Sequence, residues 1–371
     1  MKYIYTSPLS KQNKLFLLMI LCFLAASIKT EAQTAIALPD TILNVERIDE
    51  IKFKSSNFSI TGSLYVPKNV NDKKIPAVIW VSGSGPSYRT IKSTETKKVV
   101  NCFLNAGFAY FRIDKPGYGD SKGSVNEDSL FAQLSNVVVD AVKRLKEVSF
   151  IDSKRIGVFG SSQAGYIMPL AITKCKEIAF MIGSSCPAEN SIEQWNYLLE
   201  KQMVCEGYSK ERAAESIKMF STLRQTEDKN KFDESLSYFI THPLIVKSVN
   251  YDSSFTERAK KWWPREINLN DESHFNPADL LEKITIPVFM VYGEMDTQID
   301  PLQAMDAYKK AMKKNGNPLF KIKMLAGVDH NMCTAKKGCL NEIAEMNKTN
   351  SYKVSPLYIE TLNEWLKILK S

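Results

Sequence analysis

Gly160-Ser161-Ser162-Gln163-Ala164-Gly165 is the stretch of the chain that decides the fold. It follows Arg155-Ile-Gly-Val-Phe159, a short apolar run typical of a buried strand, and it precedes Tyr166-Ile-Met-Pro-Leu170, where a helical pattern begins. A strand, a very tight turn and a helix in this order are typical of a turn that lifts a nucleophilic serine above the edge of a sheet.

The spacing of small residues selects one of the two serines in this stretch. Such a turn needs small residues two positions before and two positions after the nucleophile. Gly160 and Ala164 flank Ser162 in this way, whereas a phenylalanine and a glutamine would flank Ser161. The sequence therefore predicts Ser162 as the nucleophile.

Strands and helices alternate along most of the chain, which predicts an α/β fold with a mostly parallel central sheet covered by helices on both faces. The first two predicted strands alternate polar and apolar residues, as an antiparallel pair with one solvated face would. Helices are predicted at 96–105, 130–148 and 357–369. The predicted strands are 46–54, 59–66, 75–81, 108–113, 155–159, 178–183, 286–292 and 320–325.

One interval, residues 188–282, interrupts the alternation, since it contains helical patterns and no convincing strand. We interpret it as a helical cap inserted over the carboxyl edge of the sheet. The remaining core would then consist of 33–187 and 283–371. The helices predicted within the insertion are 192–204, 210–223, 232–240 and 255–263.

A serine nucleophile needs a base, and the base is usually a histidine. The chain contains three histidines. His330 follows the last predicted strand, so it should lie at the same edge of the sheet as Ser162. His242 and His274 fall inside the predicted insertion, where structural roles are expected.

An orienting carboxylate completes this arrangement, because it holds the imidazole in one tautomer and stabilises its cation. Asp296 follows the strand at 286–292 and is the predicted partner of His330. Asp300 precedes a proline and a helical pattern, which favours a helix N-cap instead. Asp329 is adjacent to His330 in sequence, and neighbouring side chains on a loop rarely meet, so we expect a structural role for Asp329.

Ser82-Gly83-Ser84-Gly85-Pro86 follows the strand at 75–81. Glycines there let the backbone approach a substrate oxygen. We therefore expect the backbone N–H groups of Ser84 and Gln163 to form an oxyanion hole.

In this order, the glycine-rich loop, serine, aspartate and histidine resemble the α/β-hydrolase superfamily over nearly all of the chain beyond its first 32 residues. Asp114-Lys-Pro-Gly-Tyr-Gly-Asp-Ser121 resembles the D-x-R-G-x-G-x-S loop of that superfamily, with Pro116 in place of arginine. The stretch 160–165 resembles G-H-S-Q-G-G, with Ser161 in place of histidine and Ala164 in place of glycine.

The loop at 83–86, followed by Arg89, is most similar to the G-S-G-P-x-D-R loop of exported bacterial carboxylesterases. Tyr88 stands where those enzymes have aspartate, and Ser82 stands where histidine commonly precedes the first glycine. The resemblance also extends to thioesterases and serine aminopeptidase-like hydrolases.

Residues 1–32 resemble a secretory signal peptide. Lys11 and Lys14 precede an apolar run from Leu15 to Ala26, and small residues at 30 and 32 suggest cleavage before Gln33. The alternative is an uncleaved membrane anchor, although the run is shorter than the roughly 20 residues that span a bilayer. We expect an exported protein, periplasmic or secreted, with no stable membrane insertion after cleavage.

Composition excludes some partners. The chain has 371 residues, of which 44% are hydrophobic and 24% charged, and its formal net charge is +8. Four lysines and one glutamate give the leader +3 of this, and the rest is spread without long basic runs. No nucleic-acid partner is therefore expected, and neither a metal nor an organic cofactor is implied.

Six cysteines lie beyond the leader, and an even number in an exported protein permits disulfides. Cys333 and Cys339 flank a short flexible stretch and are the best candidate pair, with reduced buried thiols as an equally weighted alternative.

These observations predict a serine hydrolase that cleaves carboxylic esters, with a small-molecule or a sugar- or peptide-linked ester as substrate. A serine peptidase and a thioesterase are alternatives on the same fold, and a non-catalytic binding protein is a remote one. Arg89 is a candidate ligand for a substrate carboxylate, with a purely solvent-exposed side chain as the alternative. Trp262 and Trp263 are candidates for lining an acyl pocket, although packing of the cap onto the core is the expected role of the tryptophans. The oligomeric state is open.

Overall fold

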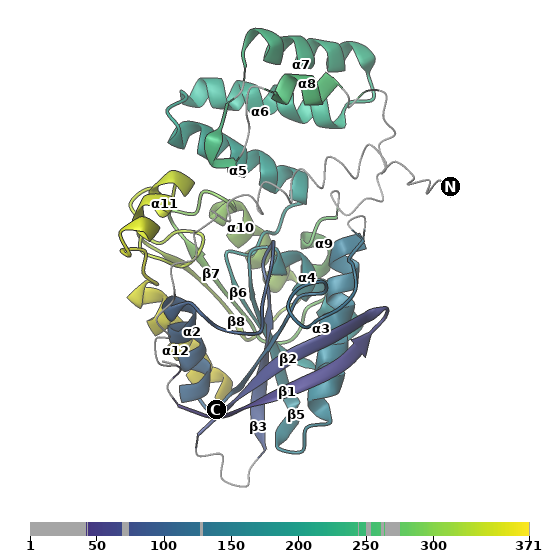
Figure 1. Ribbon diagram of the computed structural model, residues 1–371, viewed down its shortest axis with the longest axis vertical. Coiled ribbons are helices and arrows are strands. Elements are labelled where there is room, and N and C mark those ends of the chain that lie inside the picture. Colours follow the sequence, from purple (N-terminus) through teal and green to yellow (C-terminus); the bar gives the residue numbers. More distant parts are fainter. Residues whose placement is uncertain are drawn as a thin grey trace, which may run out of the picture. The chain divides into compact units, whose positions relative to one another are not determined.

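The computed structural model describes residues 42, 44–68, 74–126, 129–243, 245–249, 254–260, 263 and 275–370. An eight-stranded sheet forms the centre of this structure (Figure 1). The strands lie in the order β1-β2-β4-β3-β5-β6-β7-β8. They are β1 (Val45–Ser55), β2 (Phe58–Pro67), β3 (Ile75–Val81), β4 (Ala109–Ile113), β5 (Ile151–Ser161), β6 (Ile178–Ser184), β7 (Val288–Gly293) and β8 (Phe320–Leu325).

The predicted α/β class and all eight predicted strands are confirmed. β1 pairs with β2, and β2 with β4, in antiparallel fashion, whereas the strands from β4 to β8 are parallel. β5 begins at Ile151, earlier than predicted, since it continues past a register irregularity in its pairing with β3. Because the last six strands are parallel, their carboxyl ends share one edge.

Helices cover both faces of the sheet (Figure 1). α2 and α12 pack against each other on one face, and α3 and α4 lie together on the other. The helices of the sheet region are α2 (Thr94–Asn105), α3 (Leu130–Lys146), α4 (Ala164–Lys174), α9 (Ala278–Leu281), α10 (Pro301–Lys314), α11 (Leu340–Lys348) and α12 (Pro356–Lys370), joined by the first part of α5 (Ser191–Cys205).

Helical spacing of apolar residues explains how α12 covers its face. Tyr358, Leu362, Trp365 and Leu366 are buried at positions one and two turns apart, which form a single stripe. The Trp365 ring stacks on Phe289 of β7 with ring centroids 5.5 Å apart. The predicted closing helix is therefore fixed by aromatic burial against the parallel strands.

The chain divides into two compact units. We call Thr30–Leu198 together with Glu272–Ser371 the sheet unit, and Leu199–Asp271 the helical unit. The helical unit falls inside the insertion predicted at 188–282, and its described residues form no strand. It contains the second part of α5, α6 (Lys210–Gln225), α7 (Lys229–Thr241), the short 3₁₀ helix η2 (Lys247–Val249) and α8 (Phe255–Lys260).

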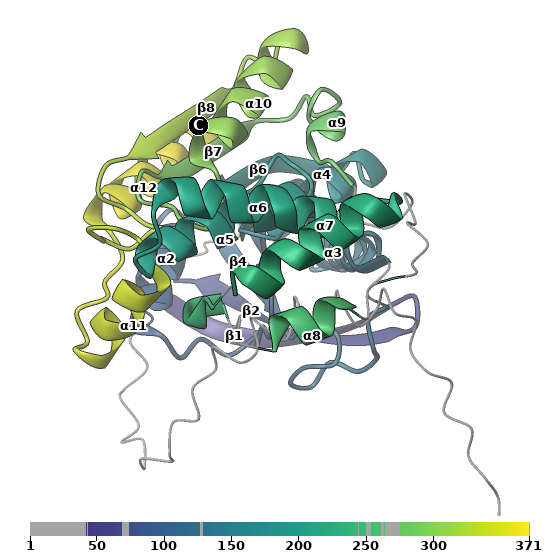
Figure 2. The same cartoon turned by 90° about the horizontal axis from the view of Figure 1, so that it is seen from above.

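The helical unit has its own apolar core. α6 and α7 lie side by side (Figure 2). Phe255 of α8 packs on Phe220 of α6 and Phe239 of α7, with ring centroids 5.8 and 5.1 Å apart. All three rings are buried, so these helices are held together by aromatic contacts. A position over the carboxyl edge of the sheet stays a prediction.

The predicted leader, residues 1–32, lies outside the described residues. Within the described part of the chain, none of the helices has the length and apolar character needed to cross a membrane.

Candidate active site

The turn after β5 has the geometry that the sequence predicted. β5 ends at Ser161 and α4 begins at Ala164. Ser162 lies between them with a φ of 54°, in the left-handed region that a non-glycine residue rarely adopts. Such strain typically costs about 1–3 kcal/mol and is common at functional sites. Ser161 is a strand residue, so the turn presents Ser162.

Close packing explains why small residues flank this serine. A Cβ atom on Gly160 would lie 2.4 Å from the Cβ atom of Ala164 and 2.7 Å from the carbonyl oxygen of Val81. A Cβ atom on Gly165 would lie 2.7 Å from Cδ of Pro187. Any side chain at 160 or 165 would therefore push the turn away from the sheet.

The backbone around Ser162 leaves one N–H group free beside it. The N–H of Ser162 donates to the carbonyl of Ser184 at 3.1 Å, and the N–H of Gly165 donates back to Ser162 at 2.8 Å. Among the described residues, the N–H of Gln163 has no acceptor. The first N–H groups of a helix lack intrahelical acceptors and carry a partial positive charge, so this N–H suits a developing oxyanion.

The loop after β3 lies directly against this turn. A Cβ atom on Gly83 would lie 3.2 Å from the carbonyl oxygen of Ser161 and 3.3 Å from Cβ of Ser162. Gly85 has a φ of 77°, which favours glycine. Ser84, between the two glycines, is exposed. The backbone of this loop therefore borders the nucleophile, as the predicted oxyanion hole requires.

Lys115 joins the two loops, and the sequence reasoning missed it. Its ammonium donates to the carbonyl oxygens of Gly83 and Gly85 at 3.2 and 3.3 Å, and to Oε1 of Gln163 at 3.2 Å. The side chain is only 7% exposed, and burial lowers its pKa to about 8. The available signal was a lysine two residues after the strand at 108–113, inside the motif that begins at Asp114.

Asp296 and His330 form a buried pair. Nδ1 of His330 lies 2.9 Å from Oδ2 and 3.1 Å from Oδ1 of Asp296. The Asp296 carboxylate also accepts backbone N–H bonds from Gln298 at 2.8 Å and Ile299 at 2.9 Å. These bonds orient the carboxylate, which in turn selects the tautomer with hydrogen on Nδ1 and leaves Nε2 as the basic nitrogen.

Two opposing effects act on the pKa of His330. Burial lowers it, since a charged imidazolium is poorly solvated in the interior, but the adjacent Asp296 charge and hydrogen bond raise it more. The net result is a pKa above the usual 6.5 of histidine.

Asp329 shapes the loop that carries His330. Its carboxylate accepts hydrogen bonds from the backbone N–H groups of Asn331 and Cys333 at 2.9 and 3.0 Å, and from the hydroxyl group of Tyr352 at 2.6 Å. Burial raises the pKa of this carboxyl group. The structural role predicted for Asp329 is confirmed, and so is the N-cap at Asp300, which accepts two backbone N–H bonds at the start of α10.

Backbone contacts bring the ends of β5, β6, β7 and β8 to one edge of the sheet. Ser185 donates to Val291 at 2.9 Å, and Met295 donates to Val328 at 2.8 Å. A Cβ atom on Gly293 would lie 2.2 Å from the carbonyl oxygen of Val328, so the His330 loop packs directly on the end of β7. Within the described structure, the Ser162 hydroxyl makes no hydrogen bond and Nε2 of His330 has no partner.

Arg89 is engaged by protein carboxylates. Its guanidinium lies 2.7 Å from Glu50, 3.3 Å from Asp114 and 2.5 Å from Asp120. Its backbone N–H also donates to Asp114 at 2.7 Å. With three acidic partners, Arg89 ties the loop after β3 to β1 and to the loop after β4, and we do not propose it as a substrate ligand.

The other predicted positions have varied outcomes. Trp263 packs on Phe232 of α7 with ring centroids 5.2 Å apart, which agrees with a packing role. Trp262 and His274 lie outside the described residues. His242 caps α7, stacks on Tyr238 and bonds to Thr241, as a structural histidine would.

The predicted disulfide is wrong. Cys333 is a buried free thiol, whereas Cys339 is disulfide-bonded, as is Cys205. The backbone of Cys333 pairs with that of Val354 in an isolated antiparallel β-bridge, whereas Cys339 lies at the start of α11. The two cysteines are close in sequence but belong to different local structures.

Metal chemistry was not expected, and the described residues contain no cluster of three or more histidine, cysteine or acidic side chains arranged to hold a metal ion.

A mostly parallel eight-stranded sheet, a left-handed serine between a strand and a helix, and a buried histidine–aspartate pair at the same edge define an α/β-hydrolase. Residues 58–328 match the family described as X-Pro dipeptidyl-peptidase (S15 family). This match spans well over half of the chain, and the chain belongs to that family.

Individual relatives are distant. An uncharacterized 31.7 kDa Escherichia coli protein from the traX–finO intergenic region is 22% identical over 214 residues, which cover 56% of this chain and 69% of that protein. The esterase Pf2001 of Pyrococcus furiosus superposes with a TM-score of 0.51 at 17% identity, covering 92% of this chain and 97% of the esterase. Dipeptidyl peptidase 4 of Porphyromonas gingivalis gives a TM-score of 0.48 at 14% identity and covers 83% and 35% of the two chains. At 17% identity the likeness to the esterase shows the fold alone.

Proposed function

We propose that this protein is an exported serine hydrolase that cleaves carboxylic esters, with Ser162 as the nucleophile, His330 as the base and Asp296 as the orienting carboxylate. The observation that carries the proposal is the buried pair of His330 and Asp296, with Nδ1 and Oδ2 2.9 Å apart, at the edge of the sheet where Ser162 is held in a left-handed turn.

The first half of the reaction forms an acyl-enzyme. Nε2 of His330 takes the proton of the Ser162 hydroxyl as its oxygen attacks the ester carbonyl. The negative charge on the carbonyl oxygen is met by the N–H groups of Gln163 and Ser84. His330 then gives its proton to the leaving alkoxide, and the ester bond to the alcohol breaks.

The second half releases the acid. A water molecule takes the place of the alcohol, gives a proton to His330 and attacks the acyl carbon, and Ser162 leaves with that proton. Asp296 stays ionised throughout and stabilises the imidazolium that forms twice in the cycle.

Peptide cleavage is the second candidate, since the family is described by an X-Pro dipeptidyl-peptidase activity. Such an enzyme must hold a free amino terminus, which favours an accessible carboxylate near the nucleophile. Glu189, which follows β6, is only 4% exposed, and one of its oxygens is buried without a hydrogen-bond partner. Burial raises its pKa to about 7. A concealed carboxyl group of this kind is a poor ligand for an ammonium group, so we rank the ester first.

Two serine variants test the nucleophile. Ser162→Ala should abolish hydrolysis of p-nitrophenyl butyrate and labelling by a fluorophosphonate probe, whereas Ser161→Ala should retain most of both. If labelling were lost in Ser161→Ala and kept in Ser162→Ala, Ser161 would be the nucleophile and the assignment to Ser162 would be wrong. Absence of labelling in the wild-type protein would remove the serine-hydrolase mechanism.

A substrate panel tests the bond that is cleaved. The wild-type protein should turn over p-nitrophenyl acyl esters and acetylated sugars with a higher kcat/KM than acyl thioesters or an X-Pro p-nitroanilide. A higher kcat/KM for the anilide, which is lost in Ser162→Ala, would establish the peptidase in place of the esterase.

Export is supported by the sequence of residues 1–32 and by the presence of disulfide-bonded cysteines, which persist in oxidising compartments. Intact mass measurement of the protein expressed in a bacterial host should show loss of the first 32 residues in the periplasmic fraction. A full-length mass in the membrane fraction would support the anchor instead.

A further inference from the structure

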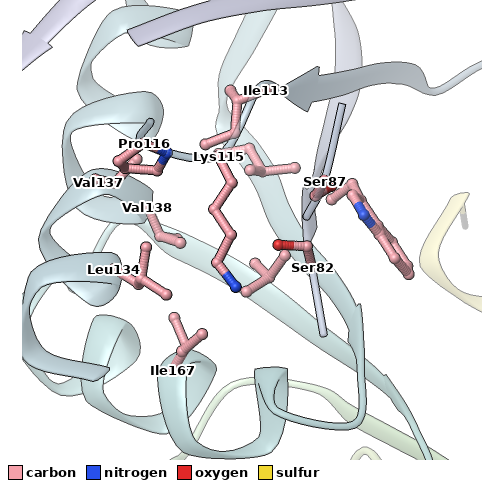
Figure 3. Close-up of a pocket in the computed structure, with 12 residues that line it drawn as sticks. Ser82, Ser87, Ile113, Lys115, Pro116, Leu134, Val137, Val138 and Ile167 are labelled. Carbon is pink, nitrogen blue, oxygen red and sulfur yellow. The ribbon is translucent and has the colours of Figure 1, made fainter. Parts of the chain in front are cut away.

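Lys115 is a buried cation that pairs with no carboxylate among the described residues. It follows β4, and its stem crosses an apolar space between the sheet and helices α3 and α4 (Figure 3). The cavity beside it has a volume of about 20 Å³ and is lined by Leu134, Val137 and Ile167, among others. Burying a charge in such surroundings is unfavourable unless its donors are satisfied.

The ammonium has three N–H donors and three acceptors. The acceptors are the carbonyl oxygens of Gly83 and Gly85 and the side-chain oxygen of Gln163, at 3.2 to 3.3 Å. The two glycines come from the loop after β3, and Gln163 comes from the turn after Ser162. One side chain therefore links the two segments that supply the proposed oxyanion donors.

Because the peptide bond is planar, the hydrogen bond from Lys115 to the Gly83 carbonyl also fixes the direction of the Ser84 N–H group. In a trans peptide, the C=O of one residue and the N–H of the next point in opposite directions. Because the C=O of Gly83 points to Lys115, the N–H of Ser84 points away from it. The N–H of Ser84 accordingly has no acceptor among the described residues and is free to meet a ligand, whereas rotation of this peptide would turn a carbonyl oxygen toward the oxyanion.

We propose that Lys115 is a positioning residue, which holds the peptide between Gly83 and Ser84 in the orientation that completes the oxyanion hole. This inference rests on the proposed serine-hydrolase function and assigns to Lys115 a role in its transition state. A backbone hydrogen bond also fastens Lys115 to the loop that carries Gly83 and Ser84, since the N–H of Lys115 donates to the carbonyl of Ser87 at 2.9 Å.

Lys115→Met tests the role, because methionine keeps an unbranched apolar stem and lacks the charge and donors. With p-nitrophenyl butyrate, kcat should fall about 10- to 100-fold while KM changes less than about twofold, since removal of an oxyanion donor affects the transition state far more than the bound substrate. Affinity for a boronic acid inhibitor, which places an oxygen in the oxyanion hole, should fall by a similar factor.

Lys174→Met is the matched control. Lys174, at the end of α4, also has uncharged acceptors among its partners, namely the carbonyl of Ala132, Oγ of Ser135 and Oδ1 of Asn136. It lies outside the two loops, so its replacement should leave kcat and inhibitor affinity within about twofold of wild type. Equal losses in both variants, or unchanged kcat in a folded Lys115→Met, would overturn the proposal.

The pH profile of the wild-type enzyme gives a second, independent test that needs no folded variant. Among the described residues, the groups around the ammonium are its three neutral acceptors, the hydroxyl-bearing Ser82 and Ser87, and the apolar residues of the cavity, and none of these groups titrates in this range. Asp114, the neighbour in sequence, is bound to Arg89. Burial brings the Lys115 pKa to about 8, so kcat should decline above about pH 8 as the amine loses its charge and one donor.

The outcomes separate this inference from the proposed function. Failure of the serine-hydrolase mechanism would show as a wild-type protein that neither labels nor turns over. Active wild-type enzyme whose kcat stays constant to pH 10, or a decline with the same midpoint in Lys115→Met, would overturn the role of Lys115 alone.

Discussion

The carboxylate of Asp296 lies 2.9 Å from Nδ1 of His330 inside the sheet unit, where the two residues are 3% and 7% exposed. The Oδ1 atom of Asp296 also accepts hydrogen bonds from the backbone N–H groups of Gln298 and Ile299. The imidazole therefore has one hydrogen-bonded orientation, which directs Nε2 away from the carboxylate.

Asp296→Asn should lower kcat for p-nitrophenyl butyrate by about 10³- to 10⁴-fold, because an amide can present its N–H to the imidazole and favour the tautomer that is not basic at Nε2. Steady-state kinetics measures the effect. Asp300→Asn is the control, since Asp300 is a helix N-cap and asparagine caps equally well. Similar activity in the two variants would contradict the role of Asp296.

The pH dependence of kcat/KM should show an acid limb set by His330. Only the neutral imidazole can take the serine proton, and Asp296 raises the pKa of His330 above 6.5. Activity should therefore rise with pH through a midpoint above 6.5. In Asp296→Asn the attraction is lost, so the residual activity should show a midpoint at lower pH, and an unchanged midpoint would assign the limb to another group.

The same pair should stabilise the folded protein more at low pH than at high pH, whereas the activity rises with pH. The folded-state pKa of His330 is raised, so its contribution to the free energy of unfolding is fully present below the unfolded pKa of about 6.5. It is lost as pH rises through the folded pKa. The difference in the free energy of unfolding between wild type and His330→Gln, measured by urea titration, should be more favourable to wild type at pH 5.5 than at pH 8.5.

Gly160→Ala should impair the turn, because the added Cβ atom would lie 2.4 Å from Cβ of Ala164. We expect kcat to fall at least tenfold as Ser162 is displaced. Gly207→Ala is the control: Gly207 has a φ of 96° and open space around it, so alanine there costs stability, about 1–3 kcal/mol, without moving the serine. Fluorophosphonate labelling rates and urea titrations distinguish the two effects.

Cys339→Ser should lower the free energy of unfolding by about 2–4 kcal/mol, since it removes a disulfide. Cys333→Ala, which changes a free thiol, should cost less. Under dithiothreitol the wild type should lose the advantage over Cys339→Ser, whereas its difference from Cys333→Ala should persist. A dithiothreitol-sensitive loss in Cys333→Ala would instead indicate that Cys333 is the bonded residue.

Local patterns were sufficient for most of the fold. Continuous apolar runs predicted the central strands, because a strand that is buried on both faces is apolar throughout. Alternation of polar and apolar residues predicted the antiparallel pair, because such a strand is buried on one face only. The small residues at 160 and 164 predicted the turn for a similarly local reason, since these two positions would clash with each other, although the turn also packs against Val81 of a distant strand. The disulfide was wrong because proximity in sequence says little about the direction of two side chains.

Sequence alone therefore determined the strand order in the chain, the tight turn at Ser162 and the candidates His330 and Asp296, all of which depend on short-range pattern and topology. Tertiary structure decided what each charged side chain meets. Arg89 is matched by three carboxylates and Lys115 by three carbonyl-type oxygens, and these partners come from separate strands and loops. Such contacts join residues distant in the chain, so only the folded arrangement, in which burial requires every donor to find an acceptor, reveals them.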